Sequence, residues 1–335
     1  MKYIFACFLA LSIVAASAQN SWPPVSMNLR LTAPIRSWDE AVPLGNGLMG
    51  GLLWGESNTI RLSLDRGDLW DERPGAEPGW WKKRTWKAGG DWDGPYGGAT
   101  PTKLPAGRLE ITLDLSQTVK AFELNLATAE GVAHLAGGGN LDAFFSAASP
   151  VALLRVPGPE PKELTLLPSG AKKEAGDAGP SSGGAVARLG YPPARHGREG
   201  RAQWYVQEAA NGLKYCACLE TRRVGNETLI AVTVTSTNDD PDLLALARRR
   251  CAAAVGQGRA ALLEPHAAWW EKFWAQSKVE VPEPEFRITM YSAGITTARP
   301  PVGARRRCRC KACGRQTTAG CLHGKAITTT TSTPR

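Results

Sequence analysis

The feature that most constrains the fold is a recurring alternation of apolar and polar residues. In the segment 60–65, Ile60, Leu62 and Leu64 alternate with polar side chains. Three further segments repeat this alternation, at 109–115, 122–126 and 230–234. Successive side chains of a β-strand point to opposite faces of a sheet, so each segment predicts a strand with one buried face. With 36 Gly and 24 Pro to form turns, the chain predicts antiparallel sheets packed face to face, in a mainly β fold.

A change of periodicity near residue 240 predicts helices in the last part of the chain. Asp240 precedes Pro241, and Pro at the first helical position is typical of a helix start. The apolar residues that then share one helical face are Leu243, Leu244, Ala247 and Cys251. We expect a second start at Pro265. It is followed by two aromatic pairs, Trp269 with Phe273 and Trp270 with Trp274. A helix this aromatic needs a large apolar partner, either the sandwich or a following domain.

Two stretches with little periodicity predict loops. Residues 73–107 are rich in Gly, Pro and Trp, and residues 168–202 combine Gly, Pro, Ser and Arg. The second stretch is the better candidate for a mobile surface insertion. The chain holds 12 Trp, and an indole face can cover the apolar face of a sugar ring. The residues that would form such a stacking platform are Trp80, Trp81, Trp86 and Trp92.

The beginning of the chain has the pattern of a secretory signal. Lys2 precedes an apolar run at 4–16, which leads into the small-residue triplet Ala16-Ser17-Ala18. This predicts a signal peptide at 1–18 that is removed before Gln19. The apolar run is short for a bilayer span and no later segment is as long, so no membrane anchor is predicted. We expect the protein to be secreted or periplasmic.

The net charge of +9 comes entirely from the end of the chain. From Arg299 onward there are nine Lys and Arg and no Asp or Glu, which leaves 31 basic and 31 acidic residues before that point. A balanced body exerts no long-range attraction on polyanions. No nucleic-acid partner is therefore predicted.

Cysteine and histidine give no sign of a metal site or a disulfide framework in the body of the chain. Of the eight cysteines, Cys7 lies in the signal and four lie beyond residue 300, which leaves an odd number. Cys216 and Cys218 would share one face of a strand and are expected to be small buried apolar residues. The histidines are isolated from one another, at His134, His196 and His266. No metal and no cofactor is predicted.

Five motifs between residues 28 and 298 carry a resemblance to a known family. The first two are Trp38-Asp-Glu-Ala-Val-Pro-Leu-Gly-Asn-Gly47 and Met49-Gly-Gly-Leu-Leu-Trp-Gly55. The others are Ile60-Arg-Leu-Ser-Leu-Asp-Arg-Gly-Asp-Leu-Trp70, Pro105-Ala-Gly-Arg-Leu109 and His266-Ala-Ala-Trp-Trp-Glu-Lys-Phe-Trp274. Together they resemble the N-terminal domain of glycoside hydrolase family 95. At Leu64-Asp-Arg-Gly-Asp68 the chain departs from the family's Leu-Asn-Glu-Asp, which indicates a divergent branch.

The resemblance implies a large N-terminal β-sandwich, a helical linker and an (α/α)6 barrel that holds the active site. Family members remove terminal α-L-fucose, or in some cases α-L-galactose, with inversion at the anomeric carbon. Inversion needs a general acid on the leaving oxygen and a base-held water on the opposite face of the sugar. The family keeps those groups in the barrel, which these 335 residues do not contain. We therefore expect a glycan substrate with a terminal α-L-fucosyl or α-L-galactosyl group for the parent enzyme, and no catalytic residue here.

Three residues on family-like loops could reach an active site from the sandwich. These candidate substrate-binding residues are Asn46, Asp68 and Trp70. Loops carry function more often than frameworks do. Each residue also has a structural interpretation. Asn46, between two glycines, would be a turn residue with positive φ, Asp68 a turn cap and Trp70 a core anchor.

The end of the chain has a composition unlike the rest. Between 303 and 335, Cys and Arg accumulate and acidic residues vanish. One interpretation is a zinc knuckle built on Cys308, Cys310, Cys313, Cys321 and His323. A second is a polyanion-binding segment. The third, which we favour, is an out-of-frame translation. From Cys313, a one-base shift permits a peptide with the Pro-Pro-Trp, Gly-Asp-Tyr-His and Asn-x-Gln elements that resemble the family's entry into its barrel.

The predicted organisation has four parts. They are a signal peptide at 1–18, an N-terminal β-sandwich at 19–240, a helical linker at 241–298 and a basic, Cys-rich, disordered tail at 299–335. The leading hypothesis is an N-terminal fragment of a secreted glycoside hydrolase resembling exo-α-L-fucosidases, inactive alone. The alternatives are a stand-alone carbohydrate-binding module and an interaction protein that acts through its basic tail.

Overall fold

The computed structural model describes residues 23–72, 102–169, 189–276, 282 and 286. The predicted signal peptide and the tail from residue 299 lie outside these residues. So do most of the two predicted loops and the four tryptophans of the proposed stacking platform, at 80, 81, 86 and 92.

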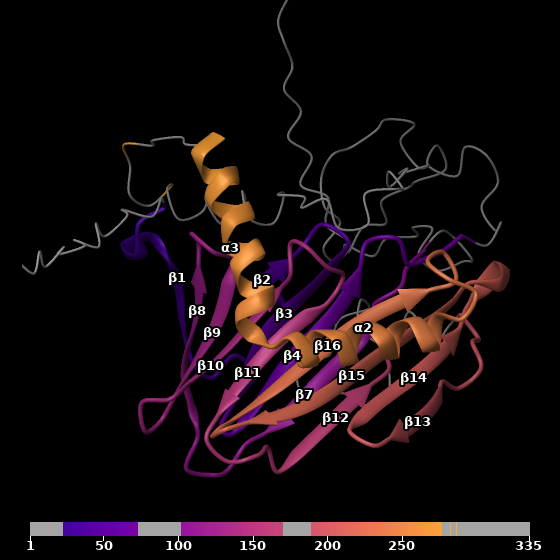
Figure 1. The fold of residues 1–335 in the computed structure, drawn as a ribbon, viewed down its shortest axis with the longest axis horizontal. Helices are drawn as coiled ribbons and strands as arrows, with labels where there is room; N and C mark the ends of the chain where they lie inside the picture. Colours follow the sequence, from indigo (N-terminus) through magenta and orange to yellow (C-terminus); the bar gives the residue numbers. More distant parts are fainter. Residues whose placement is uncertain (1–22, 73–101, 170–188, 277–281, 283–285, 287–335) are drawn as a thin grey trace, which may run out of the picture.

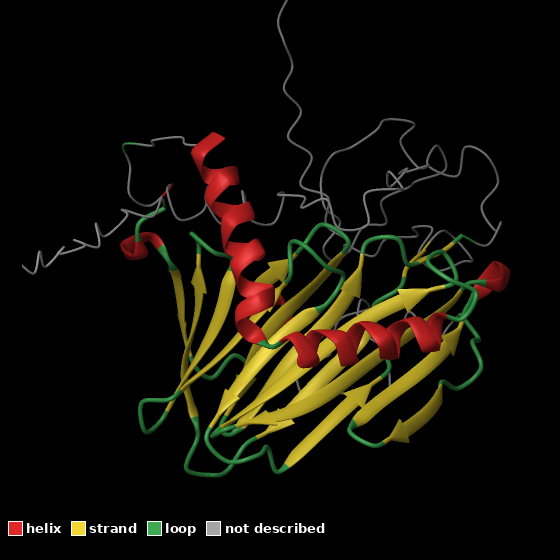
Figure 2. Cartoon of the chain, viewed as in Figure 1, coloured by secondary structure: helices red, strands yellow, loops and turns green. Residues whose placement is uncertain are grey.

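Two antiparallel sheets packed face to face form the body of the molecule (Figures 1 and 2). In chain order the strands are β1 (Leu29–Thr32), β2 (Val42–Gly45), β3 (Met49–Glu56), β4 (Thr59–Arg66), β5 (Trp70–Asp71), β6 (Thr102–Lys103), β7 (Gly107–Thr112), β8 (Val119–Asn125), β9 (Glu130–Leu135), β10 (Asn140–Phe145), β11 (Ala152–Pro157), β12 (Glu163–Leu167), β13 (Arg195–Glu199), β14 (Ala202–Glu208), β15 (Lys214–Val224) and β16 (Glu227–Ser236). The nine-stranded sheet has the order β1-β8-β9-β10-β11-β16-β15-β14-β13, and the five-stranded sheet has the order β12-β7-β4-β3-β2. The predicted antiparallel β-sandwich is confirmed.

The segments with period-two alternation line the core between the two sheets. From β4, Ile60, Leu62 and Leu64 are buried, and Leu124 of β8 and Val232 of β16 meet them from the other sheet. Burying one such side chain stabilises the fold by about 1.5–3 kcal/mol. The period of two in the sequence therefore reflects the burial of one face of each strand in this core.

At Leu115 the alternation predicts a buried strand residue that the structure does not show. The pattern puts Leu115 in a strand, but β7 ends at Thr112 and Leu115 is 77% exposed. Asp114 forms a turn instead: its carboxylate accepts from the N–H of Ser116 at 3.1 Å, and its carbonyl accepts from the N–H of Gln117 at 2.8 Å. Such local side-chain bonds compete with a strand ladder. The prediction is wrong at this residue.

The predicted loops are shorter than expected. Within 73–107, β6 pairs with β5, and within 168–202, β13 pairs with β14. The sequence of β13, Arg-His-Gly-Arg-Glu, has no apolar alternation because β13 is an edge strand with mostly exposed side chains. Charged residues on an edge strand discourage pairing with another chain.

The first long helix, α2 (Leu243–Gln257), lies across β15 and β16 on the outer face of the nine-stranded sheet (Figure 1). The carboxylate of Asp242 caps it by accepting from the N–H of Ala245 at 3.1 Å. Leu243, Ala247 and Cys251 are buried against the sheet, so the predicted apolar face is confirmed. The cap lies just after Pro241, within two residues of the expected start.

The second helix, α3 (Arg259–Gln276), begins six residues before the predicted start at Pro265, which lies inside it. The break between the helices is at Gly258, which has φ of +83° and ends α2. Glycine adopts this left-handed conformation without a steric penalty, so it is a common helix end. The chain then enters α3 at once, with the guanidinium of Arg259 bound to Glu130 and Asp142 at 2.7 Å each.

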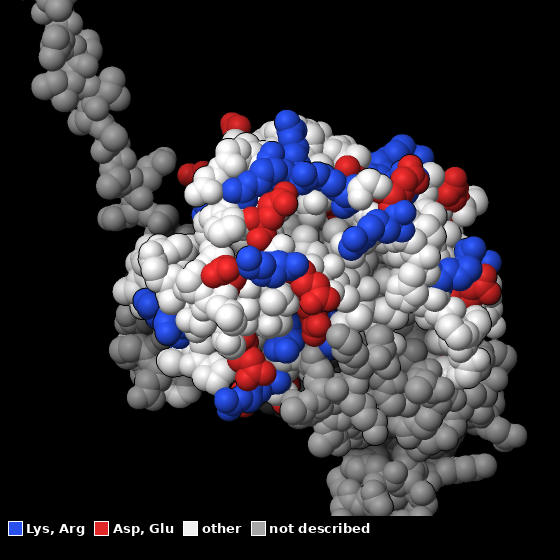
Figure 3. Space-filling model, turned by 90° about the horizontal axis from the view of Figure 1, so that it is seen from below, with Lys and Arg blue, Asp and Glu red and all other residues white. Residues whose placement is uncertain are grey.

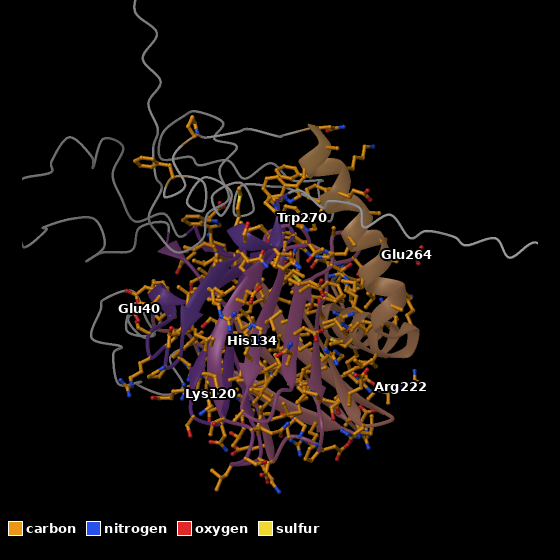
Figure 4. The ribbon with its side chains drawn as sticks, turned by 90° about the vertical axis from the view of Figure 1, so that its left-hand side faces the viewer. Glu40, Lys120, His134, Arg222, Glu264 and Trp270 are labelled. Atoms are coloured by element: carbon orange, nitrogen blue, oxygen red, sulfur yellow. The ribbon has the colours of Figure 1, made fainter. Side chains whose placement is uncertain are left out.

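The aromatic face of α3 packs on the sandwich itself. Trp270 and Trp274 are buried in the main core, and the indole N–H of Trp274 donates to the carbonyl of Leu126 at 2.8 Å. Figure 4 shows Trp270 on the side of α3 that faces the strands. Beside them the rings of Trp269 and Phe273 stack with centroids 5.5 Å apart. Of the two partners that the sequence leaves open, the sandwich buries these indoles.

Cys216, Cys218 and Cys251 are free thiols and are fully buried. The prediction that Cys216 and Cys218 act as small apolar residues is confirmed. Within the described part of the chain, neither helix is long and apolar enough to cross a membrane.

Candidate functional site

The three predicted substrate-binding residues lie at one end of the sandwich, which we call the loop end. It comprises the β2–β3 turn, the β4–β5 turn and the segments 126–129, 146–151 and 237–242. The N–H of Gly67 donates to the carbonyl of Leu48 at 2.8 Å, which joins the turn of Asp68 to the turn of Asn46. In Figure 1 this end is at the top, where α3 also projects. The structure thus brings Asn46, Asp68 and Trp70 to one end.

Asn46 is fully buried, and its amide is saturated with hydrogen bonds. Its Oδ1 accepts from the N–H groups of Leu48 and Met49 at 3.2 and 2.8 Å. Its Nδ2 donates to the carbonyls of Ser146 and Ser149 at 2.9 and 3.3 Å. The positive φ expected of Asn46 belongs to Gly47, at +81°. The side chain therefore clamps two connections of opposite sheets together, and substrate contact by Asn46 stays a prediction.

Asp68 belongs to a buried ion network centred on Arg66, whose side chain is 2% exposed. The Nε of Arg66 lies 2.6 Å from Asp68, and its Nη1 lies 2.5 Å from Asp239 and donates to the carbonyl of Val234 at 2.8 Å. Although burial acts against the charged form, these partners raise the pKa of Arg66 above its usual value. For Asp239, burial acts to raise the pKa, but the hydrogen bond and the charge of Arg66 outweigh burial, so the pKa lies below its usual value. The network ties the β4–β5 turn to the segment that leads into α2.

Trp70 is partly exposed, and its indole N–H donates to the carbonyl of Gly67 at 3.0 Å. Next to it the ammonium of Lys103 pairs with Asp65 and donates to the carbonyl of Arg66 at 2.8 Å. Trp70 is thus held by the turn and is only partly buried. Sequence reasoning missed Arg66, Lys103 and Asp239 as organisers of this end. The Asp65-Arg-Gly-Asp68 charge pattern is a local signal for Arg66, but no nearby sequence feature connects Arg66 to Asp239.

Glu130 and Asp142 are two neighbouring carboxylates of the kind that acid–base catalysis uses, but arginine side chains bind both of them. Burial raises the pKa of Glu130, and Asp142 lies close enough to interact with it. Arg259 bridges the two, and Arg155 pairs with Asp142 as well. These two carboxylates, held by two guanidinium groups, fix the start of α3.

The three histidines that the structure describes occupy separate places. His134 bonds to Glu123 at 2.9 Å on the nine-stranded sheet, His196 lies on the edge strand β13, and His266 is a buried residue of α3. Among the residues that the structure describes, no three His, Cys, Asp or Glu side chains gather in a way that could hold a metal ion.

A polar groove of about 260 Å³ lies at the opposite end of the sandwich. It is formed by residues 160–164, the β13–β14 hairpin and the facing parts of β15 and β16. An ion pair between Arg201 and Glu160, at 3.2 Å, lies beside it. Figure 3 shows basic and acidic side chains interspersed over this end. Among the described residues that line this groove, none is aromatic.

Comparison with known proteins finds a similarity to a glycoside hydrolase N-terminal domain in the first part of the chain. Residues 29–88 match the family model described as glycosyl hydrolase family 65, N-terminal domain. This match supports a glycoside hydrolase-like N-terminal domain, and the family it names is 65 rather than the 95 of the sequence motifs. No curated protein matches the chain.

Among solved structures, the chain is similar to one described as "Putative kojibiose phosphorylase from human microbiome". The TM-score is 0.46 and the sequence identity 8%, over 80% of this chain and 41% of that one. The chain thus spans less than half the length of that protein.

Proposed function

We propose that the chain is the N-terminal β-sandwich of an exported hydrolase that removes terminal α-L-fucosyl or α-L-galactosyl groups from glycans. The observation that carries the proposal is an overlap. The family-model match at 29–88 covers the motifs at 38–47, 49–55 and 60–70 that resemble family 95. The signal pattern at 1–18 supports export.

The sandwich is proposed to be inactive alone. Inverting hydrolysis needs two carboxyl groups about 6.5–9.5 Å apart around an open sugar site. At the loop end, Asp65, Asp68 and Asp239 are instead held by Lys103 and Arg66. The acid and the base would come from a following (α/α)6 barrel, and the tail from 299 would be an out-of-frame reading of that barrel's entry.

In the parent enzyme the loop end would face the active site. Asp68 and Trp70 keep partly exposed side chains there. Trp70 is the stronger candidate for sugar contact because its ring is anchored through the indole N–H and can still cover an apolar sugar face. Asn46 would act indirectly, by fixing the turn beside it.

An assay with aryl α-L-fucosides tests this proposal. The purified chain should release no aryl alcohol above a buffer blank, because the acid and the water-holding base are not present. Hydrolysis that is lost on replacing a single carboxylate of residues 19–298 would overturn the assignment. Binding to fucosylated glycans without hydrolysis would fit both this proposal and the alternative, a stand-alone carbohydrate-binding module, and the nucleotide sequence then distinguishes the two.

A further inference from the structure

The sequence contains two Asn-Gly pairs, and the structure places them in opposite environments. Asn46-Gly47 lies in the β2–β3 turn, and Asn211-Gly212 lies in the turn between β14 and β15. A glycine after asparagine leaves its backbone nitrogen free to approach the side-chain amide, because no Cβ stands in the way. The two pairs therefore share one intrinsic reactivity, and the fold decides which of them reacts.

The side chain of Asn46 is protected by burial and by hydrogen bonds. It is fully buried, and its amide makes four hydrogen bonds to backbone groups. Attack by the nitrogen of Gly47 would require the amide to turn away from these partners. Leaving buried polar groups without partners is costly, so the folded state blocks the reaction at Asn46.

The second pair lacks this protection. Asn211 and Gly212 are both exposed. Among the residues that the structure describes, none forms a hydrogen bond with the side chain of Asn211. No atom lies within 4 Å of the position that a Cβ on Gly212 would occupy. Rotations within this turn therefore bring the amide and the nitrogen together without displacing a packed neighbour.

We propose that Asn211 is a site of spontaneous modification, at which the folded protein converts asparagine to aspartate and isoaspartate through a cyclic imide. The proposal rests on exposure, an unbonded amide and the following glycine, and it does not depend on the proposed function. The turn adjoins the loop end, since the N–H of Thr237 donates to the carbonyl of Lys214 at 2.9 Å. The product would add a negative charge at this position.

The reaction consumes water and needs no enzyme, oxidant or reductant. The N–H of Gly212 gives its proton to a base, and the nitrogen attacks Cγ of Asn211. The bond between Cγ and Nδ2 breaks, and ammonia leaves. Water then opens the imide ring. Cleavage of the new Cγ–N bond gives aspartate, and cleavage of the original peptide bond gives isoaspartate. The peptide becomes heavier by the difference in mass between water and ammonia.

Peptide mapping of the folded full chain during incubation at mildly alkaline pH tests the proposal. Besides Asn46, the chain offers Asn226 as a control, which is exposed but precedes Glu227 instead of a glycine. The tryptic peptides that hold Asn211, Asn46 and Asn226 are Ala202–Lys214, Ser37–Arg61 and Val224–Arg248. Mass spectrometry with fragmentation locates each converted residue, and methylation by an isoaspartyl methyltransferase detects isoaspartate.

In the folded protein we expect Asn211 to convert at least about a hundredfold faster than Asn46, because the hydrogen bonds of Asn46 must open first. Asn226 should also convert more slowly than Asn211. Asn211→Gly tolerates the positive φ of +56° at this position. This variant should remove the mass gain from Ala202–Lys214 and leave the other two peptides unchanged.

Incubation in urea separates protection by the fold from intrinsic reactivity. Once the chain is unfolded, Asn46 and Asn211 should convert at similar rates, and Asn226 should remain slower than both. The proposal is overturned if Asn211 persists in the folded protein but converts in urea. Conversion of Asn46 or Asn226 as fast as Asn211 in the folded protein would also overturn it, and so would an Asn46 that stays unreactive in urea.

Discussion

At the scale of single residues, Arg66 joins parts of the chain that are far apart in sequence. Its guanidinium is shared between Asp68, two residues away, and Asp239, at the entry to α2. Removing it takes the shared cation away from two partly buried carboxylates and leaves Asp239 with the more distant Arg250, at 3.7 Å, so we expect Arg66→Met to lower the free energy of unfolding by about 2–4 kcal/mol. Urea unfolding followed by far-UV circular dichroism measures this change.

The matched control for Arg66 is an arginine in an exposed pair. Arg36 pairs with Glu56 at 3.1 Å, but its side chain is 71% exposed. Arg36→Met should change the free energy of unfolding by less than about 1 kcal/mol. Equal effects of the two substitutions would contradict the role given to Arg66.

Residue identity alone predicts part of this end of the molecule. Asn46 between glycines predicts a tight turn correctly, because few residues tolerate that backbone, although the positive φ falls on Gly47. That Asn46 is buried and clamps residues 146–149 could not be predicted, because its partners are about a hundred residues away. Local patterns carry no information on which distant connection completes a hydrogen bond.

At the scale of elements, His266 fastens α3 to two connections at the loop end. Its Nε2–H donates to the carbonyl of Thr128 at 2.6 Å, and its Nδ1 accepts from the N–H of Ala147 at 3.2 Å. The ring of Phe144 packs against the imidazole of His266, with the two ring centroids 4.8 Å apart. This arrangement uses the neutral imidazole, since a second ring proton would oppose the Ala147 N–H. Burial lowers the pKa of His266 from 6.5 to about 4, although the bond to Thr128 acts in the opposite direction.

This linkage predicts an acid-dependent loss of stability. Between pH 4 and 6.5 the unfolded chain binds a proton at His266 that the folded chain does not. The contribution is therefore complete above pH 6.5 and is lost as the pH falls toward 4, by up to about 3 kcal/mol. Urea unfolding at several pH values between 4 and 6.5 measures the slope of the unfolding free energy against pH. His266→Gln keeps one donor and one acceptor and should flatten it; an unchanged slope would contradict the assignment.

The elements themselves differ in how well sequence predicts them. Strands such as β4 and β16 were predictable because each buries at least one face, and a period of two records that burial. β13 was not, since an edge strand can be polar throughout. The start of α3 was misplaced because Pro265 is a stronger sequence signal than Gly258, although Gly258 is where the backbone turns.

At the scale of the whole molecule, the sandwich class follows from the sequence but the strand order does not. Neighbours such as β1 and β8, or β4 and β7, are joined by pairing between distant segments. Alternation states that a strand has a buried face and leaves its partner unspecified. The same holds for the proposed function: the loop end collects Asn46, Asp68 and Trp70, while the proposed hydrolysis would need a further domain that pairs with this sandwich.

We propose that this sandwich is one part of a larger glycoside hydrolase, and the nucleotide sequence offers the decisive test. Near codons 303–312 we expect a one-base insertion or deletion. Beyond it, the restored frame should stay open for several hundred codons and encode apolar residues at helical spacing, as paired helices of an (α/α)6 barrel require. A restored frame that closes at once, followed by DNA for an unrelated protein, would contradict the claim.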